Sequence, residues 1–129
     1  MTKKIVAAAF LFSLFASVVF SADWVFFGSS NDGKTYHYDR ASVKNKGGKV
    51  TFATRLVYAQ PEKYYYGNVN VEEDEWWMDC RNRLCQITYE REYDENGKLV
   101  HSLNTRTSQK PEMVAPGSFT ETLYQHVCR

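Results

Sequence analysis

The sequence predicts an α+β domain in which an antiparallel β-sheet of five or six strands, arranged as a meander of hairpins, carries a C-terminal α-helix. Apolar and polar residues alternate with a period of two in several segments, which is typical of strands. Groups of Gly, Asn and Asp separate these segments at 28–33, 47–48 and 94–97, where hairpin turns need them. The end of the chain changes to helical spacing, so the helix follows the sheet.

Residues 1–21 have the pattern of a secretory signal peptide. Lys3 and Lys4 precede an apolar run at 5–20, and small residues follow at Ser21 and the next position. The run is shorter than the roughly 20 residues of a membrane-spanning helix. We therefore expect cleavage after Ser21.

Residues 22–129 are expected to form one exported domain, either periplasmic, secreted or at the cell surface. The first cysteine is Cys80, so the apolar run is not followed by a thiol for lipidation, and we expect no stable membrane anchor. Without the signal peptide, 14 basic residues face 15 acidic ones. This balance excludes the basic surface of a nucleic-acid-binding protein.

The first strands are expected at 24–27 and around Tyr36 and Tyr38, as a hairpin, and the clearest strand spans 50–58. In that strand one face carries the residues Val50, Phe52, Leu56 and Tyr58, and the other carries Thr51, Ala53, Arg55 and Val57.

The middle of the chain is expected to contain a long loop. Residues 59–74 have no sustained period and are interpreted as irregular. Strands are predicted at 75–80, 84–93 and 99–104, with Gly97 closing the last hairpin. Within 84–93 one face is expected to hold Ile87, Tyr89, Arg91 and Tyr93.

The C-terminal helix is predicted to begin after Ser118. Ser118 and Glu121 have the spacing of a capping box, in which each side chain accepts a hydrogen bond from a backbone N–H at the helix start. Phe119, Leu123 and Val127 follow at helical spacing and are expected to face the sheet.

Three cysteines in an exported chain predict one disulfide and one free thiol. A bridge between Cys80 and Cys128 would tie the helix to a strand and stabilise the domain by about 4 kcal/mol. The alternatives use Cys85, which would lie opposite Cys80 if the intervening turn had an even length. The first pairing is favoured, and the role of Cys85 is left open.

No sequence motif of catalysis, metal binding or cofactor binding is present. His37, His101 and His126 lack partners at metal-ligand spacing, and the acidic run at 72–75 lacks the pattern of a calcium loop. We interpret that run as a solvated loop. The chain is expected to be no enzyme and to hold neither metal nor cofactor.

Aromatic residues mark a candidate contact surface. Lys63, Tyr64, Tyr65 and Tyr66 lie in the predicted long loop, and long loops of compact domains are often functional. Tyrosine is enriched at interfaces, but it also packs in small cores. The hypothesis is that these four residues contact a protein partner.

Several short motifs resemble the surface-adhesin protein E family across nearly all of residues 22–129. They are Trp24, Tyr36-x-Tyr38-Asp39, Asp79-Cys80 before a Tyr-rich strand, Asn96-Gly97, and Pro116-Gly117-Ser118 with Cys128. The resemblance implies an antiparallel sheet with a C-terminal helix, no catalysis, and a bridge between Cys80 and Cys128. For the namesake it implies binding of matrix or serum proteins such as vitronectin and laminin, and haem binding is attributed to it.

Two functions therefore follow as expectations. The first is a non-catalytic adhesin that binds a host or envelope protein. The alternative is a soluble periplasmic inhibitor or accessory protein, because the namesake's lipidation cysteine is missing here. Either protein is compatible with a homodimer.

Overall fold

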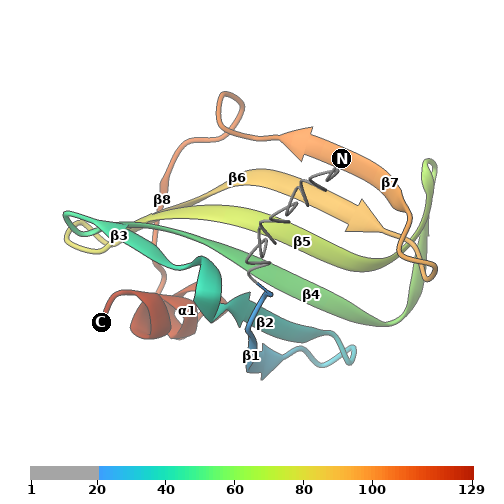
Figure 1. The fold of residues 1–129 in the computed structure, drawn as a ribbon, viewed down its shortest axis with the longest axis horizontal. Coiled ribbons are helices and arrows are strands. Elements are labelled where there is room, and N and C mark those ends of the chain that lie inside the picture. The colour runs from blue at the N-terminus through green and yellow to red at the C-terminus, as the bar shows by residue number, and fades with distance from the viewer. Residues whose placement is uncertain (1–20) are drawn as a thin grey trace, which may run out of the picture.

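The computed structural model describes residues 21–129, in which one antiparallel sheet carries an α-helix on one of its faces (Figure 1). The predicted signal peptide lies, apart from Ser21, outside the described residues and stays a prediction. The strands are β1 (Trp24–Ser29), β2 (Thr35–Asp39), β3 (Lys44–Lys46), β4 (Lys49–Tyr64), β5 (Gly67–Asp79), β6 (Leu84–Tyr93), β7 (Leu99–Asn104) and β8 (Glu112–Met113), and the helices are the short 3-10 turn η1 (Arg40–Ser42) and α1 (Phe119–Val127).

The sheet is a meander with the order β1-β2-β4-β5-β6-β7, in which β3 pairs with β4 and β8 pairs with β6. The predicted antiparallel sheet and C-terminal helix are confirmed. The sheet of the described residues has eight strands rather than five or six, because two short edge segments add to the predicted meander.

The core lies between α1 and one end of the sheet, on what we call the helix-side face. Val50 on β4, Met78 on β5 and Cys85 on β6 are neighbours across the strands and are all buried. Leu123 and Val127 of α1 pack into the same cluster. Cys85 is therefore a core residue with a free thiol.

The prediction of an irregular loop at 59–74 is wrong. β4 continues to Tyr64, and β5 begins at Gly67, so the two strands form one long hairpin. The register slips between Val57 and Glu62, and this slip explains why the sequence shows no period there. Gly67 has a φ of +140°, a conformation that side-chain-bearing residues rarely adopt, which lets the chain reverse directly.

The predicted face of 84–93 is wrong at one residue. Trp76 pairs with Ile87 but Glu75 pairs with Tyr89, so Thr88 is an extra residue that forms a β-bulge. Ile87 therefore lies on the helix-side face, beside Trp76, while Tyr89 lies on the opposite face. The alternation of Ile87, Tyr89, Arg91 and Tyr93 continues through Thr88, so the sequence does not reveal this bulge.

The capping box of α1 is confirmed. Ser118 Oγ accepts a hydrogen bond from the Glu121 N–H at 3.2 Å, and Glu121 Oε2 accepts one from the Gly117 N–H at 2.7 Å. At the first turn, Phe119 lies so close to Gly28 that a Cβ on Gly28 would be 2.7 Å from its ring. Any residue other than glycine at this position of β1 would therefore force the Phe119 ring to shift.

The other end of α1 is held by the Cys80–Cys128 disulfide, with a Cα–Cα distance of 5.6 Å. The favoured pairing is confirmed. The alternative pairing with Cys85 fails because Cys85 pairs with Met78 across the strands and lies in the core. Tyr124 Oη also donates a hydrogen bond to the Cys80 carbonyl at 2.6 Å. The end of α1 is therefore attached to Cys80 by both a disulfide and a hydrogen bond.

Candidate functional site

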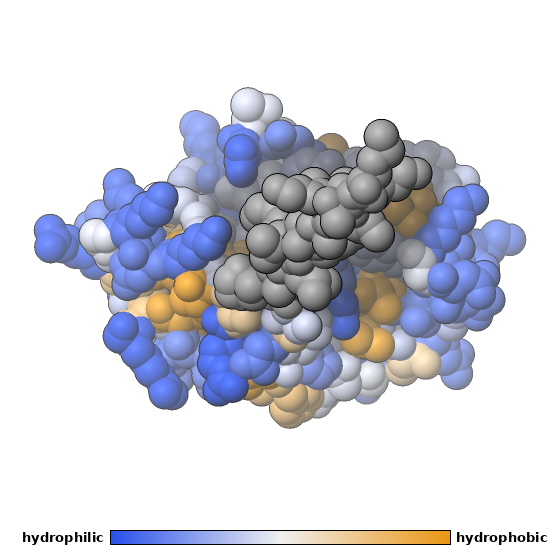
Figure 2. Space-filling view, viewed as in Figure 1, coloured by the Kyte–Doolittle hydropathy of each residue, from blue (hydrophilic) through white to orange (hydrophobic). Residues whose placement is uncertain are grey.

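The residues 63–66, which we call the hairpin tip, connect β4 to β5 at the end of the sheet away from α1 (Figure 1). Figure 2 shows hydrophilic side chains gathered at this end of the molecule. Tyr65 is 96 % exposed there, whereas Tyr66 is partly buried. A large aromatic side chain therefore projects from a polar surface.

Two of the three tyrosines, Tyr64 and Tyr66, form a stack that holds the tip, although Tyr64 is still 38 % exposed. The Tyr66 ring stacks on the rings of Tyr64 and His101, with centroid distances of 5.3 and 4.3 Å. The Tyr66 hydroxyl donates a hydrogen bond to the Glu92 carboxylate. Burial and the charge of Glu92 raise the pKa of Tyr66, so its hydroxyl remains a donor at any physiological pH.

The structure therefore divides the four predicted contact residues into two pairs. Lys63 near the end of β4 and Tyr65 on the turn are exposed and take no part in the stack, whereas the partly exposed Tyr64 and Tyr66 form the stack that supports the turn. Tyr65 meets the edge of the Tyr66 ring at a centroid distance of 4.9 Å. The contact role of the tip remains a prediction, now concentrated on Tyr65.

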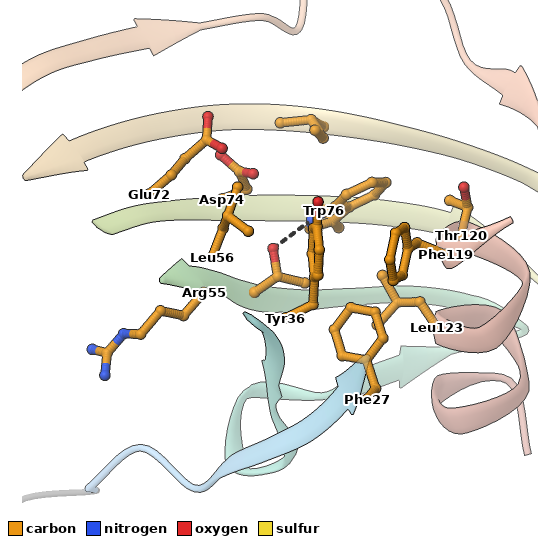
Figure 3. A pocket seen from close by; sticks show the side chains of 12 residues that line it. Phe27, Tyr36, Arg55, Leu56, Glu72, Asp74, Trp76, Phe119, Thr120 and Leu123 are labelled. Carbon is orange, nitrogen blue, oxygen red and sulfur yellow. Dashed lines mark hydrogen bonds between the residues drawn. The ribbon is translucent and has the colours of Figure 1, made fainter. Parts of the chain in front are cut away.

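The second feature is a cavity of about 230 Å³ on the helix-side face, next to the first turn of α1 (Figure 3). What we call its aromatic wall consists of Phe27, Tyr36, Trp76 and Phe119. Leu56, Ile87 and Leu123 add aliphatic surface. Phe119 stacks on Tyr36 with a centroid distance of 4.2 Å, so part of this wall comes from the helix.

Carboxylates close the cavity at the end away from α1. Glu72 and Asp74 line it from β5, and Glu90 lies across from Asp74 on β6. One carboxylate oxygen of each residue lies within 4.8 Å of the others, and we call these three residues the acidic cluster. Figure 3 shows the carboxylates of Glu72 and Asp74 side by side, away from Phe27 and Leu123.

The acidic cluster is desolvated and lacks a neutralising cation among the described residues. Asp74 is only 8 % exposed, and its Oδ1 atom has no hydrogen-bond partner within residues 21–129. Burial and the neighbouring carboxylates raise the pKa of Asp74 to about 9 and that of Glu72 to about 7, and they also raise the pKa of Glu90. The cluster is therefore partly protonated at neutral pH.

The sequence model of the surface-adhesin protein E family matches residues 24–129, nearly all of the described chain. The chain belongs to the surface-adhesin protein E family. No curated protein and no solved structure matches the chain significantly.

Membership of the surface-adhesin protein E family implies a non-enzymatic role and an exported or surface protein. None of the helices within residues 21–129 has the length and apolar character needed to cross a membrane. The resemblance noted in the sequence, and the fold that it implied, are thus confirmed. The partner is a separate question, because a fold shared by a family does not specify what each member binds.

In this family member the interpretation of 72–75 as a solvated loop is wrong. The run lies within β5, where neighbouring residues point to opposite faces, so Glu72 and Asp74 face the cavity. Glu73 instead accepts hydrogen bonds from Arg55, and Glu75 pairs with Arg91 on the opposite face. The sequence signal was available, because any strand through four acidic residues must place two of them on each face.

Within the described residues, the acidic cluster brings three potential metal ligands close together. The histidines considered as metal ligands lie on different elements: His37 on β2, His101 on β7 and His126 on α1. Burial raises the pKa of the Cys85 thiol, so this cysteine is a poor nucleophile. The expectation that the protein has no cofactor stays a prediction.

Proposed function

We propose that the protein is an exported, non-catalytic binding module that contacts a host or envelope protein through its hairpin tip. The observation that supports the proposal is the nearly complete exposure of Tyr65 on a tip that stacking holds in place. Membership of the surface-adhesin protein E family supports adhesion as the class of function.

Tyr65 has the properties of an interface anchor. Its side chain has large apolar area, few rotatable bonds and a hydroxyl, and such residues contribute most of the binding energy in many interfaces. Because the stack beneath it is already ordered, less conformational entropy is lost when a partner binds. Charges of both signs lie beside it, since Lys63 is exposed and Glu62 pairs with Lys34 at 3.0 Å.

The test is a binding measurement on purified residues 22–129 with vitronectin and laminin, the partners that the family resemblance implies, each immobilised on a sensor surface. We expect Tyr65→Ser to weaken binding at least tenfold without changing the melting temperature. Phe26→Ser is the matched control, because Phe26 is 56 % exposed on β1 and outside the tip. Equal binding by wild type and Tyr65→Ser would contradict the role of the tip.

Location separates the adhesin from the alternative of a soluble periplasmic inhibitor or accessory protein. We propose that the mature protein begins at Ala22 and carries no lipid, which the intact mass of the exported protein measures directly. Labelling on intact cells supports an adhesin. Recovery in the osmotic-shock fraction alone supports the periplasmic alternative.

A further inference from the structure

The cavity beside α1 is separate from the hairpin tip. Its two ends differ in polarity, and the proposed protein contact at the tip does not explain this difference. One end is aromatic and aliphatic, and the other end consists of carboxylates. Buried carboxylates ordinarily have hydrogen-bond donors or cations as partners. Asp74 Oδ1, although buried, has neither within the described residues.

The basic residues near the cavity are engaged elsewhere. Arg55 lines the cavity, but its guanidinium is directed away from it in Figure 3, donates to Glu73 at 2.6 Å and stacks over the Trp24 ring. Lys34 lies near enough to Glu72 to influence its charge, yet it pairs with Glu62 and Asp32. No basic side chain of residues 21–129 forms an ion pair with the acidic cluster. The raised pKa values of Asp74 and Glu72 mean that protons offset part of the cluster's charge, so a cation that binds there replaces those protons.

We propose that this cavity binds a small organic cation, whose ammonium or guanidinium group contacts the acidic cluster and whose apolar body lies against the aromatic wall. Charge complementarity places the cationic group at Asp74, the most buried carboxylate of the cluster. Aromatic faces attract cations as well as apolar groups. The aromatic wall can therefore also contact the carbon atoms bonded to the charged nitrogen.

A bare metal ion fits the cavity less well than an organic cation. Calcium takes six to eight oxygen ligands, and magnesium keeps several waters in an octahedral shell. Here the carboxylates occupy one end only, and the Thr54 hydroxyl already accepts a hydrogen bond from the Trp76 indole at 2.8 Å. Apart from Thr120 and Tyr36, which carry hydroxyls, the remaining wall consists mainly of carbon atoms, which suit an apolar body better than a hydrated ion.

The volume limits the ligand to a small molecule. At about 230 Å³ the cavity is smaller than the roughly 300 to 1,000 Å³ of pockets that hold drug-sized ligands. An amine with one aromatic ring is of suitable size. The test therefore uses 2-phenylethylamine, together with two probes that each carry half of its chemistry, 2-phenylethanol for the apolar body and methylammonium for the charge.

The experiment is a titration of the oxidised protein, residues 22–129, at pH 8, followed by calorimetry and by the NMR signal of the Trp76 indole N–H. We expect 2-phenylethylamine to bind at least tenfold more tightly than either half-probe and to shift the Trp76 signal. Asp74→Asn should weaken this binding at least tenfold. Glu75→Gln, on the same strand but the opposite face, should leave it unchanged.

Glu72→Gln provides a second variant that keeps Asp74, and it should weaken amine binding as well. Equal affinities for 2-phenylethylamine and 2-phenylethanol would overturn the proposal, since the carboxylates would then contribute nothing. Tight binding of calcium or zinc that depends on Asp74 and displaces the amine would overturn it in favour of a metal site. Loss of vitronectin or laminin binding in Tyr65→Ser does not bear on this test, because Tyr65 is not among the residues that line the cavity.

Discussion

The two ends of the helix-side face consist of the same three strands but differ in polarity. Toward α1 the face carries Val50, Met78 and Cys85, which are buried beneath the helix. Farther along, β5 presents Asp74 and Glu72 and β6 presents Glu90. β4 and β5 pair without interruption from Val50 to Leu56, whereas the pairing of β5 with β6 shifts at the Thr88 bulge between the two ends.

The difference shows which end is optimised for folding. The covered end hides apolar area from water, which is the main favourable contribution to folding. The acidic end brings like charges together in a desolvated place, which destabilises the folded state. Destabilising groups of this kind are typical of binding sites.

Cys128→Ser should destabilise the covered end most. The disulfide closes a loop with a sequence separation of 48 residues, so its loss should lower the free energy of unfolding by about 4 kcal/mol. Urea denaturation followed by tryptophan fluorescence measures this. Cys85→Ala is the control, because it removes a buried thiol but no bridge and should cost about 1 kcal/mol. A smaller loss for Cys128→Ser than for Cys85→Ala would contradict the assigned role.

Asp74→Asn should raise the free energy of unfolding, whereas Cys128→Ser should lower it. The folded-state pKa values of Asp74 and Glu72 are raised above those of the unfolded chain, so the folded state holds their protons more strongly. Their stabilising effect is complete below about pH 4 and is lost as the pH rises toward 9. The variant cannot ionise, so at pH 8 its free energy of unfolding should exceed that of the wild type by on the order of 2 kcal/mol.

The pH series also tests the neighbours of Asp74. Glu90 and Glu92 on β6 raise its pKa together with Glu72. Melting temperatures measured from pH 5 to pH 8 should fall for the wild type and fall less for Asp74→Asn. A wild-type protein that is more stable at pH 8 than at pH 5 would show that the acidic cluster is not desolvated as described.

Substitutions in the hairpin tip should have an intermediate effect on stability. They distinguish Tyr66, which supports the tip, from Tyr65, which is proposed to contact a partner. Tyr66→Ala removes the stack on Tyr64 and His101 and the hydrogen bond to Glu92, at an expected cost of roughly 1 to 2 kcal/mol. Tyr65→Ala should cost less than about 0.5 kcal/mol, because Tyr65 is exposed. Thermal melting measures both. Equal losses would mean that Tyr65 is part of the support and not a free anchor.

Ser118→Ala should have the smallest effect at the covered end. It removes the side chain that accepts from the Glu121 N–H at the start of α1, which costs about 1 kcal/mol in comparable helices. The disulfide holds the other end of α1, so the helix should remain docked. Circular dichroism with thermal melting tests this, and a loss as large as that of Cys128→Ser would contradict it.

The sequence by itself determined the antiparallel meander, the capping box and the class of fold, because these depend on local patterns. Alternation over 50–58, the turn at Gly97 and the spacing of Ser118 and Glu121 each act within a few residues. The Cys80–Cys128 pairing was favoured because it would tie the helix to a strand and because the family resemblance implied it. It had two competitors, since disulfide connectivity depends on which chain segments meet.

Only the tertiary structure decided where β4 and β5 pair and what the acidic run faces. The bulge at Thr88 interrupts a strand whose sequence alternates evenly, and the register slip after Val57 leads into residues that show no period. In both places the pairing with the neighbouring strand sets the register. The cavity needs Phe119 from α1 and Asp74 from β5, 45 positions apart in the sequence. Such a site exists only once the helix lies on the sheet, because no local pattern brings a buried carboxylate and an aromatic wall together.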